Sequence, residues 1–150
     1  MDDRSEATLA TLHEEAQFRF RVLGNRINKQ ISPFIWKWID GSRSYERQAQ
    51  LYAAYKRGGP RAAPPGFSWH QFGFAADGGL FLEDSRHYVP ESHFYDIATR
   101  EGKRLGFHTG ADFGAIPHYS FRPPTLEGLS EGAALKAMRS RRLEGVPFWP

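Results

Sequence analysis

The sequence of 150 residues contains no cysteine. Disulfide bonds, thiolate ligands for zinc and cysteine nucleophiles are therefore excluded, and any metal site must use His, Asp and Glu. Long apolar runs are also absent, since no stretch reaches the roughly 20 residues that a membrane-spanning helix needs. The acidic, polar start Met1–Glu6 lacks the basic end and apolar run of a secretory signal. We therefore expect no membrane span, and a product made in the cytoplasm without a signal peptide.

Length and charge limit the class of protein further. A chain of 150 residues is the size of one domain, and folding at this size buries about 68 to 70% of the unfolded surface, so we expect a single domain over residues 1–150. The net charge is +3, which favours anionic surroundings such as nucleic acid, membranes or envelope polymers. No nucleic-acid motif supports the first of these, so we expect no nucleic-acid partner. A solvated helix end is the simpler explanation of the cluster Arg139, Arg141 and Arg142.

Periodicity and turn residues predict a mixture of helices and short strands. Apolar residues recur at steps of three and four in one long segment, which predicts a helix over about 5–29, and Ser44 suits the N-cap of a second helix. The apolar tail at 145–150 is expected to fold onto the core, with a partner-binding patch as the alternative. The other expected elements are strands at 34–40, 73–82 and 117–122, a loop at 58–69, and helices from Ser92 to Gly106 and over about 130–142.

One segment carries the chemistry of a metal site. In Ser68-Trp69-His70-Gln71-Phe72-Gly73-Phe74-Ala75-Ala76-Asp77, an imidazole and a carboxylate lie seven residues apart. Both are good zinc ligands, and a catalytic zinc site has three protein ligands with the fourth position left to water. His118, in Ile116-Pro117-His118-Tyr119, is the best third ligand. Two histidines and an aspartate suit zinc best but admit other divalent ions, and a core histidine beside a surface carboxylate would explain the first pair alone.

The pattern S-x-H-x-x-G-x-A-x-D followed by P-H-[aromatic] resembles the zinc D,D-carboxypeptidase and L-alanyl-D-glutamate endopeptidase family of peptidoglycan hydrolases, to which phage endolysin peptidases belong. Gly41–Tyr52 is similar to that family's G-x-R-S-x-x-x-Q-x-x-L-[YF] helix start, and the proline-rich Ala63–Ser68 resembles the approach to its first histidine. The resemblance implies an α+β fold of the hedgehog/D,D-peptidase type, in which a small antiparallel sheet is flanked by helices. It also implies Zn2+ in a cleft on the sheet, held by His70, Asp77 and His118.

The same resemblance implies roles for other polar residues. Arg43 would bind the substrate and stabilise the transition state, because a guanidinium offers a planar fork for a carboxylate or an oxyanion. Gln48 and Ser68 would bind substrate or orient the groups that do. A helix glutamine and a loop serine are also common where there is no site at all.

One position departs from the family pattern. The family usually carries Asp or Glu three residues before its last histidine, where this chain has Ala115, and the segment Gly110–His118 is about three residues short. A carboxylate general base contributes about 10²- to 10⁴-fold to such reactions, so activity should fall by that order unless Asp112 or Glu101 reaches the site. Of these two, we assign the role to Asp112. An engineered replacement at position 115 would give the same sequence.

These observations lead to three functional hypotheses. The first is a zinc metallopeptidase of the endolysin or effector type that hydrolyses the peptidoglycan stem peptide, preferably at the L-alanyl-D-glutamate bond, with D,D-carboxypeptidase activity as the alternative. Such a protein would reach the cell wall through a holin or a secretion apparatus. The second is a catalytically impaired, zinc-containing module that binds stem peptides, which Ala115 favours. The third is a basic protein associated with the envelope or with nucleic acid.

Overall fold

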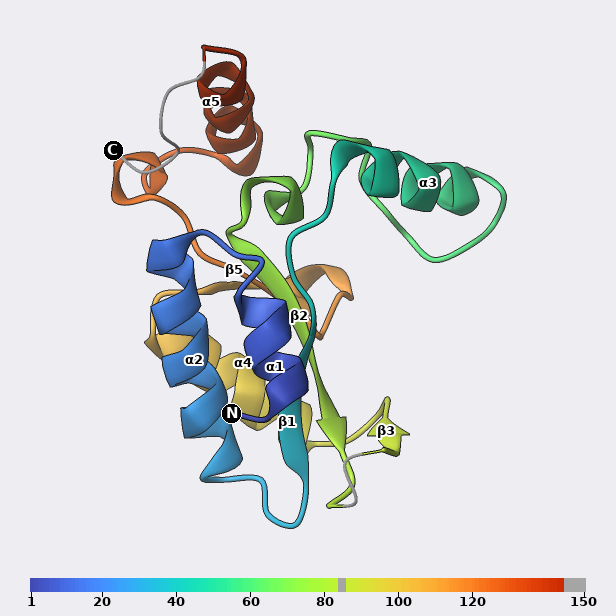
Figure 1. Cartoon of the computed structure of the whole chain (residues 1–150), viewed down its shortest axis with the longest axis vertical. Coiled ribbons are helices and arrows are strands. Elements are labelled where there is room, and N and C mark those ends of the chain that lie inside the picture. Colours follow the sequence, from blue (N-terminus) through green and yellow to red (C-terminus); the bar gives the residue numbers. More distant parts are fainter. Residues whose placement is uncertain (84–85, 145–150) are drawn as a thin grey trace.

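A computed structural model describes residues 1–83 and 86–144 of the chain (Figure 1). Its sheet has the strand order β1 (Ile35–Asp40), β2 (Ala75–Phe81), β5 (His118–Ser120) and β4 (His108–Thr109), and β3 (Tyr88–Val89) pairs with β2. All of these pairings are antiparallel. The predicted α+β class, with a small antiparallel sheet flanked by helices, is confirmed.

Three helices pack against the sheet and one another: α1 (Asp3–Leu9), α2 (Glu14–Asn28) and α4 (Phe94–Arg104). The core between them is aromatic, with Trp36 and Trp38 of β1 lying edge-on to Tyr119 of β5. The indole N–H of Trp38 donates to the carbonyl of Phe20 on α2 at 3.2 Å. Gly78 leaves the space that the Trp36 ring fills, because a Cβ there would overlap the ring.

The outer edge of β1 is covered by side chains from the first two helices. Ser5 Oγ accepts the backbone N–H of Trp38 at 3.0 Å. The side-chain amide of Asn28 accepts the N–H of Trp36 at 2.8 Å and donates to its carbonyl at 3.3 Å. Because these backbone groups of β1 already have hydrogen-bond partners, the edge of the strand is protected from pairing with another chain.

The continuous helix predicted over 5–29 is wrong, because the segment forms α1 and α2 with a break at residues 10–13. The break is fixed by contacts with distant segments. Thr11 Oγ1 accepts the N–H of Ser42 at 2.9 Å, and the N–H of His13 donates to the carbonyl of Gly73 at 2.9 Å. Apolar periodicity missed the break because Leu9, at the end of α1, and Leu12, within the break, are both buried.

At the other end of the molecule lie α3 (Tyr45–Lys56), α5 (Glu131–Glu144) and the 3-10 turns η1 (Trp69–Phe72) and η3 (Pro124–Leu126). A third 3-10 turn, η2 (Gly110–Phe113), follows β4 directly in the chain. Ser44 caps α3 as predicted, accepting the N–H of Arg47 at 3.0 Å. α3 projects from the body, and Gln48 is its one buried residue. The apolar tail at 145–150 lies outside the described residues. Within those residues, no helix combines the length and apolar character that crossing a membrane requires.

Candidate metal centre

Three side chains form a row across the sheet, on the face opposite the tryptophans. Asp77 of β2 lies between His118 of β5 and Asp40 of β1 in the strand register. The register of β1 shifts between Trp38 and Asp40, which is a β-bulge. Without this extra residue Ile39 would face Asp77 and Asp40 would point to the opposite face, because side chains alternate along a strand. The bulge therefore brings a second carboxylate to the site.

His70 reaches this row from η1, which follows the loop predicted at 58–69. Ser68 Oγ accepts the N–H of His70 at 3.3 Å at the start of the turn, and Gly73, with φ of 76°, ends it. Nδ1 of His70 lies 2.6 Å from the carbonyl of Gly41, to which it donates. This bond fixes the ring tautomer, so the lone pair of Nε2 points toward Asp77 and His118. A larger residue at 41 would overlap Thr11.

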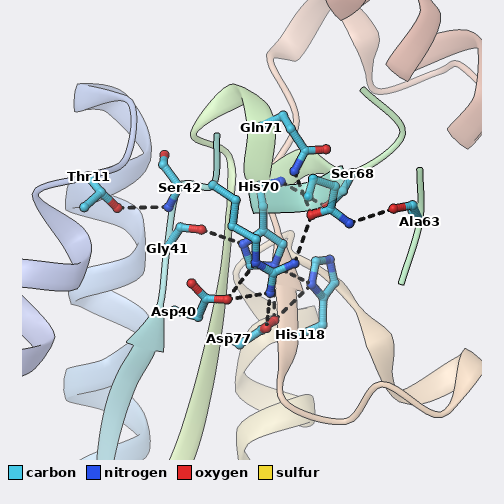
Figure 2. Close-up of polar contacts among 12 residues, drawn as sticks. Thr11, Asp40, Gly41, Ser42, Ala63, Ser68, His70, Gln71, Asp77 and His118 are labelled. Atoms are coloured by element: carbon cyan, nitrogen blue, oxygen red, sulfur yellow. Dashed lines mark hydrogen bonds and ion pairs between the residues drawn. The ribbon is translucent and has the colours of Figure 1, made fainter. Parts of the chain in front are cut away.

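The three predicted ligand atoms converge (Figure 2). Nε2 of His70 is 3.2 Å from Nδ1 of His118 and 3.3 Å from Oδ1 of Asp77, and Nδ1 of His118 is 3.1 Å from Oδ1 of Asp77. Ligands at zinc distances of about 2.0 to 2.1 Å in a tetrahedron lie about 3.3 Å apart. The triangle therefore has the dimensions of one face of a zinc coordination sphere.

The donor set also fits a cation. Because Nε2 of His70 carries no proton, it and Oδ1 of Asp77 are two acceptors facing each other, and one proton on Nδ1 of His118 cannot satisfy both well. A zinc ion would bind all three lone pairs at once. The side chain of His70 is only 2% exposed, whereas those of Asp77 and His118 are 22% and 18% exposed. The open side leaves room for a water or a substrate as the fourth ligand.

Asp77 is held in the charged form that a metal ligand needs. Burial raises the pKa of its carboxyl, but hydrogen bonds and positive charge from the rings of His118 and His70, when each carries its second proton, outweigh this effect. The pKa of Asp77 therefore lies well below its ordinary value. Its second oxygen, Oδ2, accepts a hydrogen bond from Nη2 of Arg43 at 2.9 Å, which leaves Oδ1 to face the two histidines.

Arg43 lies beside these three side chains, with its guanidinium between the carboxylates of Asp40 and Asp77. Nε and Nη2 contact Oδ2 of Asp40 at 2.7 and 2.6 Å, and Nη2 also reaches Asp77. Nη1 donates to Oε1 of Gln48 at 3.4 Å. The backbone N–H of Arg43 donates to the carbonyl of His70 at 3.0 Å, so the arginine and the first ligand share one local framework.

Gln48 and Ser68 support the site from behind. Gln48 is 1% exposed, and besides Arg43 its amide contacts Gln71 at 3.0 Å and the carbonyl of Ala63 at 2.7 Å. Its observed role is to orient Arg43, whereas that of Ser68 is to cap η1. Substrate contact by either residue stays a prediction. Sequence reasoning missed Asp40, although its place three residues before Arg43 was a usable signal.

A second residue that sequence reasoning missed connects two ligand-bearing segments. Glu131, the first residue of α5, accepts the indole N–H of Trp69 at 2.9 Å through Oε1 and binds Arg122 through Oε2. Trp69 precedes His70 in η1, and Arg122 follows β5, which carries His118. Glu131 and His118 also line one cavity of about 300 Å³, together with Ser120.

For the carboxylate missing at position 115, the sequence offers two replacements, Asp112 and Glu101. Ala115 begins a tight turn in which its carbonyl accepts the N–H of His118 at 2.9 Å. The side chain of Asp112 lies outside the described part of the structure, so its assignment as general base stays a prediction. Glu101 is engaged elsewhere, in ion pairs with Arg104 at 3.1 Å and Arg26 at 3.6 Å.

No protein-family model matches this sequence, and no curated protein gives a significant match. Solved structures share the fold. The L-Ala D-Glu endopeptidase ChiX of Serratia marcescens has a TM-score of 0.55 at 22% identity, over 81% of this chain and 88% of its own. The L,D-carboxypeptidase DacB of Streptococcus pneumoniae has a TM-score of 0.54 at 19% identity, over 96% and 82%. A mutant of the vancomycin-resistance D,D-pentapeptidase VanY, in complex with Zn(II), has a TM-score of 0.56 at 20% identity, over 83% and 76%. At these identities the likeness establishes the fold.

Proposed function

We propose that this chain is a zinc peptidase that acts on the stem peptide of peptidoglycan. The observation that carries the proposal is the triangle of His70, Asp77 and His118, with atom separations of 3.1 to 3.3 Å and Arg43 beside it. Structures of the same fold that are peptidoglycan peptidases, one of them with Zn(II) bound, support the choice of substrate and metal.

The chemistry follows from the arrangement of the residues. When bound, zinc lowers the pKa of its water to about 7 and supplies a nucleophile at neutral pH. Asp77 and the two histidines would hold the ion. Arg43, held by Asp40, Asp77 and Gln48, would direct the one remaining N–H of its Nη1 at the carbonyl oxygen or carboxylate of the substrate. The cavity beside His118 gives the peptide a place to lie.

Within stem peptides we favour the L-alanyl-D-glutamate bond. The endopeptidase ChiX is covered by this chain over 88% of its length, a larger share than for the carboxypeptidase DacB or for VanY. Cleavage at this bond creates a new N-terminal D-glutamate, whereas D,D-carboxypeptidase action releases free D-alanine. Access to the wall through a holin or a secretion apparatus stays part of the proposal.

Ala115 favours a second candidate, a zinc-containing module that binds stem peptides without cutting them. A proton must pass from the attacking water to the leaving amine, and a carboxylate normally carries it, contributing about 10²- to 10⁴-fold. Both candidates share the metal and the arginine. They differ in turnover alone.

The test measures zinc content and the products formed from purified peptidoglycan, with and without a chelator. We expect one zinc per chain and chelator-sensitive release of new N-terminal D-glutamate. One zinc without any product would identify the binding module, and release of D-alanine would identify a carboxypeptidase. A chain that binds no zinc would overturn both candidates.

The variant Ala115→Asp separates an impaired enzyme from a binding module. Since position 115 is joined to His118 by a backbone hydrogen bond at 2.9 Å, a carboxylate there lies within one turn of a metal ligand. We expect kcat to rise by about 10²-fold, the lower end of a general base's contribution. Ala115→Asn is the matched control, because it has the same shape without the charge. Equal rates in the two variants would show that the shortened segment no longer delivers a base.

A further inference from the structure

Positive charge is concentrated at one end of the molecule. We define the basic end as residues 44–67, which comprise α3 and the loop after it, together with α5 at residues 131–144. These segments hold eight Lys and Arg and three Glu, a net charge of +5. The whole chain has a net charge of +3, so the remaining residues carry −2. The positive potential therefore belongs to this end and not to the molecule as a whole.

The two parts of the basic end contact each other. The guanidinium of Arg142 on α5 lies 3.9 Å from the ring centre of Tyr45, the first residue of α3. The guanidinium of Arg139 lies 4.0 Å from the ring centre of Phe67, and its Nη1 donates to the carbonyl of Gly66 at 2.9 Å. These contacts join α5 to the start of α3 and to the end of the loop that follows α3.

The surface suits a dissolved polyanion better than a lipid bilayer. A helix that lies in a membrane surface needs an outward apolar face, but α5 turns its apolar residues Ala134, Leu135 and Met138 into the core. Tyr55, Phe67 and Leu143 are exposed at this end, each on a different element. Helix α3 adds a cationic arm about 18 Å long, at 1.5 Å per residue.

The basic end also adjoins the metal centre. Helix α3 begins two residues after Arg43, and the loop that follows it leads to His70. A long polyanion bound at the basic end would therefore hold the metal centre close to the surface that carries the polymer. Several phosphates along one polymer would each contact a cation, and their binding would release counterions.

We propose that the basic end binds a phosphodiester-linked polyanion of the bacterial envelope. The attraction for a polyanion follows from the charge distribution. The choice of an envelope polymer over nucleic acid rests on the proposed function.

The test uses the full chain and deacylated poly(glycerol phosphate), with neutral dextran as the reference polymer, across a range of salt concentrations. The variant Arg57→Gln/Arg61→Gln/Lys136→Gln removes three exposed cations of the basic end. The control Arg4→Gln/Lys29→Gln/Arg86→Gln removes three exposed cations elsewhere, with the same change in net charge. We expect the slope of log K against log salt to fall by about 2 in the first variant, at about 0.7 per lost contact on a flexible strand.

If the two lines of log K against log salt meet at about 1 M salt, a slope change of about 2 makes the first variant bind roughly 40-fold more weakly at physiological salt. The control should bind as the unmodified chain does. Equal losses in both variants, or none in either, would overturn the proposal. Tighter binding to oligothymidylate or to phosphatidylglycerol vesicles would show that the partner is nucleic acid or lipid. Hydrolysis of a small soluble stem peptide, measured in parallel, should be the same in both variants. Its absence from the unmodified chain would count against the peptidase and leave the polymer result standing.

Discussion

The charge of Arg43 is shared between two aspartates that differ in role. Asp77 offers one oxygen to the metal position and the other to Arg43, whereas the partner of Asp40 within the described residues is Arg43. Asp40 is also the more exposed of the two, at 45% against 22% for Asp77. Removing Asp40 should therefore release the guanidinium without disturbing the ligands.

We expect Asp40→Ala to retain one zinc per chain and to lower kcat by roughly 10- to 100-fold, the range found for residues that orient groups around a metal. Metal analysis and steady-state kinetics measure the two effects separately. Asp96→Ala, an exposed aspartate on α4, is the control and should match the unmodified chain. Loss of zinc from Asp40→Ala would show that Asp40 takes part in binding the metal.

At the scale of elements, α5 sets the distance between two segments that carry ligands. Glu131 accepts from Trp69, next to His70, and pairs with Arg122, beyond the strand of His118. The side chain of Arg122 is only 6% exposed, so this carboxylate also compensates a nearly buried charge. The bridge from η1 through Glu131 to the end of β5 should therefore hold His70 and His118 at their spacing.

The variant Glu131→Gln should bind zinc about tenfold more weakly, because the amide cannot accept from both partners. Competition with a chromophoric chelator measures this affinity. Glu127→Gln is the matched control, since Glu127 lies on the segment just before α5 and pairs with His108 of β4. A purely structural role would lower the Tm of the metal-free protein and leave the zinc affinity unchanged, and that result would contradict the prediction.

The elements of this fold were predictable where local chemistry decides them. Ser44 caps α3, and the alternating residues of 35–40 form β1, as the sequence indicates. Three other features were not predictable: the break between α1 and α2 at His13, the turn around His70, and the bulge before Asp40. Each depends on a partner far away in the chain: Gly73 for His13, Gly41 for His70, and Asp77 for Asp40.

The sequence singles out His70, Asp77 and His118 as a group because their residue types and spacing carry the signal, and the structure brings the three together. Their geometry was not predictable, since it needs the register that places Asp77 beside His118 and the turn that delivers His70. The role of Glu131 was invisible from sequence because it acts through Trp69, which is 62 residues away. Long-range hydrogen bonds of this kind leave no local pattern.

At the scale of the whole molecule, the metal position joins parts of the chain that are distant in sequence. His70 and His118 are 48 residues apart and belong to η1 and β5, while Asp77 belongs to β2. The unfolded chain cannot hold these atoms 3.1 to 3.3 Å apart, so zinc should bind the folded state almost exclusively. Stability should therefore depend on the concentration of free zinc.

Free zinc at 100 times its dissociation constant should stabilise the fold by about 2.7 kcal/mol. For a domain of this size that corresponds to an increase in Tm of about 5 to 10 °C. Calorimetry with added zinc and with a chelator measures the difference. The variant His70→Ala lacks the most buried of the three proposed ligands, so its Tm values with zinc and with chelator should coincide. The control His87→Ala changes an exposed histidine and should keep the full increase in Tm. An increase that persists in His70→Ala would place the stabilising metal at a different site, because Asp77 and His118 alone leave half of a tetrahedral coordination sphere unfilled.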